Sequence, residues 1–181
     1  MTKRVVLGVV LLVAAATAVS GQGFRRIGAI LSGFNEPPSI STVGSGEFSA
    51  EIDNDETSIS WELSYDNLES AVQQAHIHFA QRDVNGGITV FLCSNLGNGP
   101  AGTQPCPPSP ATITGTITAV DVSPPIPATQ AARNQGLGTG ELAELVRAIR
   151  EGSTYANVHT TTFPGGEVRG QLGNGHGHGG R

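Results

Sequence analysis

Residues 73–93 have the sequence QQAHIHFAQRDVNGGITVFLC, in which two apolar stretches are separated by a polar turn. The turn contains Asn85 and Gly86, which favour a tight connection between antiparallel strands. Because side chains alternate between the two faces of a strand, His76 and His78 should project from the same face. The stretch therefore predicts a β-hairpin that carries two neighbouring imidazoles on one side.

Short segments with the same alternation occur on both sides of this hairpin. An apolar strand at 27–31 ends in a Gly/Asn/Pro turn, and residues 46–68 alternate on both sides of the turn at 53–56. Further strands are expected at 111–122 and on either side of the Pro-Gly-Gly turn at 164–166. Residues 123–138, rich in Pro and then in Gly, are expected to be irregular.

One segment has a helical rather than a two-residue period. Its apolar residues recur at three-and-four spacing, at Leu142, Leu145, Val146 and Ile149. We expect a short helix over about 139–151, with Thr139 capping its start and Gly152 its end. Short strands with a single helix predict a mostly β fold, an antiparallel β-sandwich or barrel of about 7–8 strands.

The two ends of the chain are not expected to belong to the domain. Residues 1–20 resemble a secretory signal peptide, with Lys3 and Arg4 before an apolar run and small residues after it. The run is shorter than the roughly 20 residues of a spanning helix, so we expect cleavage and no membrane span in the mature chain. Residues 173–181, mostly Gly and His, are expected to form a disordered tail. The domain should occupy residues 27–172 of a secreted, extracellular or cell-envelope protein.

The charge balance restricts the kind of partner. Without Lys3 and Arg4, eight basic residues remain against 15 acidic ones, a net charge near minus seven. Nucleic acids and anionic membranes are bound through basic patches, which such a chain lacks. The sequence therefore disfavours a nucleic-acid partner and leaves an extracellular protein or a glycan, of unknown identity, as the expected partner.

The only two cysteines, Cys93 and Cys106, flank a loop rich in Gly, Pro and Asn. In an oxidising compartment they are expected to form a disulfide across that loop. Thiols that bind metals or carry out redox reactions usually occur as C-x-x-C, a spacing that this pair does not have. The pair therefore supports export.

Four motifs in order resemble the CHRD domain, the repeat named after chordin and found singly in exported microbial proteins. They are E-P-P at 36–38, A-H-I-H at 75–78, Y-A-N-V-H-T at 155–160 and G-E-V-R-G-Q-L at 166–172. The similarity covers about residues 27–172. It implies the same β fold but no particular reaction. In chordin these domains accompany cysteine-rich modules that bind growth factors, and this chain has no such module, so growth-factor antagonism is not expected.

The histidines of the domain are the candidate site. If the strands that carry His76, His78 and His159 lie close together, the three imidazoles could bind copper or zinc. The order of these residues is similar to that in copper/zinc superoxide dismutase, also an antiparallel sandwich with a loop disulfide, which suggests related redox chemistry as a hypothesis.

Two other interpretations remain open. The histidines could instead belong to a buried polar network with Asn157, Thr160, Glu167 and Arg169. They could also act in acid–base catalysis, although no Ser-His-Asp spacing, phosphate loop or paired-carboxylate motif accompanies them. The sequence therefore favours a non-enzymatic exported domain that binds another molecule, with a metal-binding protein as the alternative.

Overall fold

The computed structural model describes residues 23–175, so the expected signal peptide at 1–20 and the end of the expected tail lie outside the described residues. The fold is mostly β, as the alternation predicted, and all strand pairs are antiparallel. The main strands are β1 (Arg26–Ser32), β2 (Ser45–Ile52), β3 (Ile59–Asp66), β4 (Val72–Phe79), β5 (Gly87–Ser94), β6 (Ala111–Ile117), β7 (Thr154–Thr160) and β8 (Val168–Gln171).

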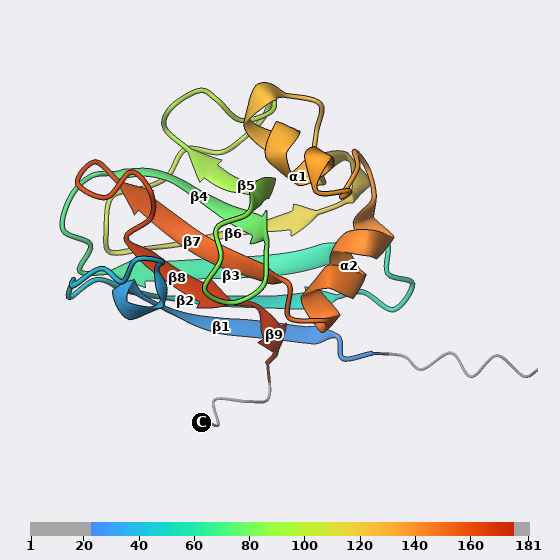
Figure 1. Cartoon of the computed structure of the whole chain (residues 1–181), viewed down its shortest axis with the longest axis horizontal. Coiled ribbons are helices and arrows are strands. Elements are labelled where there is room, and N and C mark those ends of the chain that lie inside the picture. Colours follow the sequence, from blue (N-terminus) through green and yellow to red (C-terminus); the bar gives the residue numbers. More distant parts are fainter. Residues whose placement is uncertain (1–22, 176–181) are drawn as a thin grey trace, which may run out of the picture.

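These eight strands form one sheet in the order β5-β4-β7-β8-β1-β2-β3-β6, which curls into a nearly closed barrel (Figure 1). The seam lies between the two end strands, β5 and β6. There Gln104 donates hydrogen bonds from Nε2 to Leu92 O on β5 and to Thr114 O on β6, both at 3.1 Å. One side-chain amide thus connects the two strands that close the barrel.

The loop at this seam also contains the expected disulfide. Cys93 and Cys106 are bonded, with their Cα atoms 5.1 Å apart. Asn95 fixes the same loop, because its side chain donates to Cys106 O at 2.9 Å and accepts from Cys106 N at 3.0 Å. The described residues contain no free cysteine.

The predicted helix is present as α2 (Leu142–Arg150), and all of its periodic apolar residues are buried. Gly152 follows its end with a positive φ of 65°, as a helix C-terminus favours. The capping role expected for Thr139 was wrong: its hydroxyl donates to Ser123 O at 2.7 Å, and no side chain caps the helix start. Tertiary contact with the preceding loop takes the hydroxyl away from the helix.

A second short helix, α1 (Gln130–Asn134), lies in the segment expected to be irregular. It packs on β5, and both helices lie on the right of the view in Figure 1. Three 3-10 turns complete the helical structure, at η1 (Gly33–Asn35), η2 (Ala119–Asp121) and η3 (Pro127–Thr129). The turn η2 ends β6 earlier than the strand expected at 111–122. None of the helices in residues 23–175 is long and apolar enough to cross a bilayer.

The described chain continues into the segment expected to be tail. Gly173 and Asn174 form a two-residue strand, β9, which pairs with β1 at Gly28 and Ile27. The described structure therefore includes residues 173–175, and only residues 176–181 of the expected tail lie outside it.

The barrel interior is filled by apolar side chains from every main strand. Trp61 is buried and stacks on Phe48 with ring centroids 6.4 Å apart. On β4 and β7 the inward residues are Ala75, Ile77, Ala156 and Val158, all essentially inaccessible to solvent. The residues between them must point away from this core, because side chains alternate along a strand.

Candidate functional site

The side of β4 and β7 that faces away from the apolar core is buried as well. Every residue of β7 is buried, as are His76 and His78 on β4. The register places His76 opposite Asn157 and His78 opposite Tyr155, so these side chains share one face. These two strands therefore separate an apolar core inside the barrel from a second, polar core outside it.

The three histidines of the sequence-based prediction meet in this outer core. One ring nitrogen from each of His76, His78 and His159 lies within 4.8 Å of the other two. His76 Nδ1 is 3.2 Å from His159 Nε2, and the rings of His76 and His78 meet edge to face, with centroids 5.4 Å apart. The same-face prediction for His76 and His78 is confirmed, and β7 supplies the third ring.

Backbone carbonyls fix the orientation of two of the rings. His78 Nδ1 lies 3.0 Å from Gly86 O, and His159 Nδ1 lies 3.0 Å from Pro164 O. A carbonyl can only accept, so both Nδ1 atoms must carry the proton and donate it. In the neutral rings the Nε2 atoms of His78 and His159 therefore carry lone pairs, and that of His159 can accept from His76 Nδ1.

Burial keeps the rings neutral. It is the main reason why the pKa of His78 falls to about 3 and the pKa values of His76 and His159 fall below the usual value. Neighbouring imidazoles lower the pKa values of His76 and His78 further, because two adjacent positive charges would repel each other. At neutral pH the cluster thus presents unprotonated nitrogens, the form that metal binding requires.

Two of these ring nitrogens have no hydrogen-bond partner. His76 Nε2 and His78 Nε2 are buried and unpartnered, although His76 is completely inaccessible and His78 nearly so. An unsatisfied buried polar atom costs about 1–3 kcal/mol, so folded proteins rarely retain one without a reason. The outer core therefore contains two lone pairs for which the protein itself supplies no donor.

Asn157 brings an oxygen to the same place. Its Oδ1 lies 3.0 Å from His159 Nε2. Because His159 Nδ1 holds the proton, two acceptors face each other at this contact, an arrangement that a shared cation would stabilise. Asn157, predicted as part of a polar network, is therefore also a candidate ligand.

Glu36 lies next to this amide and was not predicted. It follows η1 in the segment that leads away from β1, and it is 6% exposed. Burial raises the pKa of Glu36 to about 7, against the opposing influence of the Arg169 charge and of a hydrogen bond with the Asn157 side chain. The E-P-P motif contains this residue, but nothing in the local sequence shows that it folds over β7.

A stack of three side chains closes another side of the cluster. The Tyr155 ring lies parallel to His78, with centroids 4.7 Å apart, and Arg169 Cζ lies 3.3 Å above the Tyr155 ring centroid. Arg169 also donates to Asn85 Oδ1 at 3.1 Å and to Val84 O at 2.7 Å. Arg169 thus contacts the cluster through Tyr155, a residue that sequence analysis missed.

The remaining two residues of the expected network lie elsewhere. Thr160 donates to Glu167 Oε2 at 2.6 Å, and Glu167 Oε1 accepts from Thr42 at 2.8 Å and from Glu69 N at 2.9 Å. These contacts join β7 to two loops. None of these hydrogen bonds reaches the three rings, so the group holds the fold together beside the cluster.

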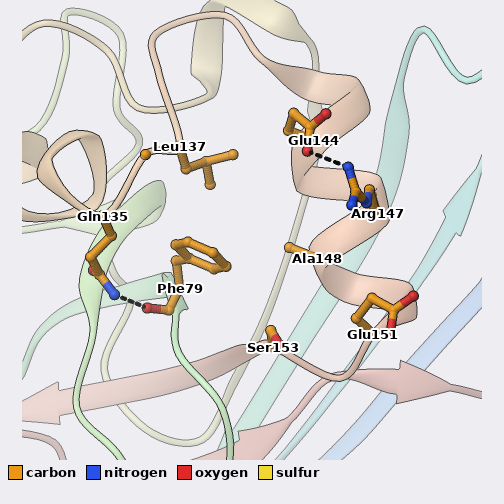
Figure 2. A pocket seen from close by; sticks show the side chains of 9 residues that line it. Phe79, Gln135, Leu137, Glu144, Arg147, Ala148, Glu151 and Ser153 are labelled. Carbon is orange, nitrogen blue, oxygen red and sulfur yellow. Dashed lines mark hydrogen bonds and ion pairs between the residues drawn. The ribbon is translucent and has the colours of Figure 1, made fainter.

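A separate pocket of about 280 Å³ lies between α2 and the end of β4, and Figure 2 shows Phe79 and Leu137 facing α2 across it. Its rim carries an exposed ion pair between Arg147 and Glu144 at 3.5 Å. None of the buried unpartnered polar atoms of residues 23–175 belongs to a residue that lines it. This pocket therefore lacks the unpartnered buried nitrogens that the histidine cluster has.

The fold and the ordered motifs agree with a family comparison. A family model described as the CHRD domain matches residues 27–172. The chain belongs to the CHRD domain family. All three clustered histidines, Asn157 and Glu36 lie inside the matched CHRD domain. A search of curated proteins and a search of solved structures found no match.

Proposed function

We propose that this CHRD domain is an exported metal-binding protein that holds one copper or zinc ion between His76, His78 and His159. The observation that carries the proposal is the pair of unpartnered buried nitrogens, His76 Nε2 and His78 Nε2, beside a third imidazole. A metal ion would satisfy these lone pairs at once. Hydrogen bonds alone leave them without a donor.

The chemistry of the donor set fits these metals. Neutral imidazole is a preferred ligand of copper and zinc, and three protein ligands with an open position are typical of catalytic zinc sites. Ligating histidines commonly donate their other ring nitrogen to a carbonyl, as His78 and His159 do with Gly86 and Pro164. Asn157 Oδ1 would provide a fourth, oxygen ligand.

Two finer points of function belong to this proposal. Export is supported by the Cys93–Cys106 disulfide, because disulfides persist in oxidising compartments. If the ion is copper, the site would supply one-electron redox chemistry, and a superoxide dismutation assay of the copper-loaded protein tests it. Binding of an extracellular protein or glycan does not compete with the metal site, because such a partner would contact the surface and the histidines are buried.

Metal analysis of protein without an affinity tag tests the proposal. His176 and His178 of the tail are first replaced by alanine, so that only the domain can bind. We expect about one copper or zinc ion per chain. After a chelator has removed this metal, adding copper or zinc should raise the thermal stability of the protein. At a free metal concentration 100 times Kd, the stabilisation should be about 2.7 kcal/mol.

Two variants in the same background make the test specific. His78→Ala should lose both the bound metal and the stabilisation. Gln74→Ala is the matched control, because Gln74 lies on the same strand but does not belong to the cluster. Metal-free wild-type protein with unchanged stability in copper and zinc, or full metal retention by His78→Ala, would contradict the proposal.

A further inference from the structure

A pocket of about 360 Å³ opens beside the outer core, between the segment after η1 and the β7–β8 turn. Its walls are mostly apolar, formed by Pro37, Pro38, Ile40, Phe163 and Pro164. Glu36 is the one residue with an ionisable side chain among those that line it. This composition, apolar walls with a single charged group, is typical of sites for small organic ligands.

One oxygen of the Glu36 carboxyl group, Oε1, is placed as an anchor for a ligand. The residue is 94% buried, since 6% of it is exposed, and Oε1 has no hydrogen-bond partner. No ion pair of the described residues includes it. Arg169, whose charge lowers the pKa of Glu36, donates its hydrogen bonds to Asn85 and Val84. A buried carboxylate in this state lacks a donor that a ligand could supply.

The neighbouring glycine leaves room at this oxygen. Gly166 has a φ of 128°, and a Cβ placed there would collide with Glu36 Oε1 and would also approach Asn157 Nδ2 to 2.9 Å. The adjacent Gly165 differs, because a Cβ added there would meet nothing within 4 Å. The Glu36 carboxylate therefore occupies the space that a side chain at Gly166 would fill, and it can take this position only beside a glycine.

We propose that this pocket binds a small primary alkylammonium ion, with its charged group on Glu36 and its alkyl chain against the proline and phenylalanine walls. An ammonium group supplies donors and a positive charge, which are the two things that the buried carboxylate lacks. Phe163 adds an aromatic ring, and aromatic rings attract cations. The pocket is distinct from the metal site, because none of the three clustered histidines lines it, although Asn157 lies between Glu36 and His159.

The direct test is a titration of ¹⁵N-labelled protein with n-butylamine, followed by NMR, at pH 8 in the presence of EDTA. The chelator removes any metal that the amine could bind, so success or failure here is separate from that of the metal site. We expect saturable shifts at the amides of Thr162, Gly165 and Gly166. Titration with n-butanol, which has the same chain but no charge, should give no saturable shift.

Three variants make the outcome decisive. Glu36→Gln keeps the shape of the side chain but removes its charge, and it should weaken n-butylamine binding at least tenfold. Gly166→Ala should also abolish binding by displacing the Glu36 carboxylate, whereas Gly165→Ala should bind as the wild type does. Unchanged affinity in Glu36→Gln, or no saturable shift in the wild-type protein, would overturn the proposal. The Glu36→Gln result decides even if Gly166→Ala fails to fold.

Discussion

The two faces of β4 and β7 are both buried, but one is apolar and the other is polar. Toward the barrel interior, Ile77 and Val158 pack among other apolar side chains. On the other face, His76, His78 and His159 are buried to a similar extent but leave ring nitrogens without partners. The comparison teaches that burial of a strand alone does not reveal its role. Packing explains the inner face, whereas unsatisfied polar groups on the outer face destabilise the folded protein.

Such a cost suggests that the outer face is retained for what it binds. Hydrophobic burial contributes about 1.5–3 kcal/mol for a large aliphatic side chain, whereas an unsatisfied buried polar atom costs about 1–3 kcal/mol. The protein could have covered this face with apolar residues, as it did inside the barrel. Three predictions distinguish the two faces, beginning with the largest expected effect.

The first prediction concerns acid. Burial holds the pKa of His78 at about 3, below the unfolded value of 6.5. A lowered pKa means that the contribution of His78 is fully present above pH 6.5 and is lost as the pH falls toward 3, because the unfolded chain takes up the proton first. For His78 alone the loss in free energy of unfolding reaches about 5 kcal/mol. This loss is measured by urea unfolding at a series of pH values from 7.5 downward, with a chelator present to keep the protein free of metal.

The control for this prediction is His78→Phe, which keeps an aromatic ring next to Tyr155 but cannot bind a proton. As the pH falls, the free energy of unfolding of this variant should decrease less steeply than that of the wild type. The difference between the two slopes should correspond to the uptake of one proton. Identical pH profiles for the two proteins would show that His78 is not buried in its neutral form.

The second prediction concerns the inner face. Ile77→Ala should lower the free energy of unfolding by about 4 kcal/mol, because it leaves a cavity in a packed core. The loss should be the same at pH 7.5 and at pH 5.5, since no ionisable group changes. Metal binding, measured as above, should be retained. Loss of the metal in this variant, despite a folded structure, would mean that the two cores are not separate.

The third prediction concerns Glu36, which is buried beside Asn157. Burial raises the pKa of Glu36 to about 7, above the ordinary value of 4.5. A raised carboxyl pKa means that stability is fully present below pH 4.5 and is lost as the pH rises through 7. Glu36→Gln should therefore be more stable than the wild type at pH 8, by up to about 3 kcal/mol, and unchanged at pH 4.5.

Urea unfolding at these two pH values tests the prediction, with Glu47→Gln on the exposed side of β2 as the control. The control should differ from the wild type by no more than about 0.5 kcal/mol at either pH. A loss of stability at pH 8 in Glu36→Gln would instead show that the carboxylate is held by a favourable charge interaction.

Much of the architecture follows from local patterns. Alternation located the strands, and the three-and-four spacing located α2, because both periods depend only on backbone geometry. The same geometry placed His76 and His78 on one face. Local patterns failed at α1, a five-residue helix in a Pro-rich segment, and at Thr139, whose hydroxyl makes a tertiary contact.

The sequence alone determined where the eight main strands form, the pairing of Cys93 with Cys106, and the shared face of two imidazoles. Only the tertiary structure decided that His159 joins them, that both faces of β7 are buried, and that Glu36 is buried beside Asn157. The physical reason is the range of the interactions. Periodicity acts between neighbours in the chain, whereas the carbonyls, the third ring and the carboxylate come from segments that meet only when the barrel closes.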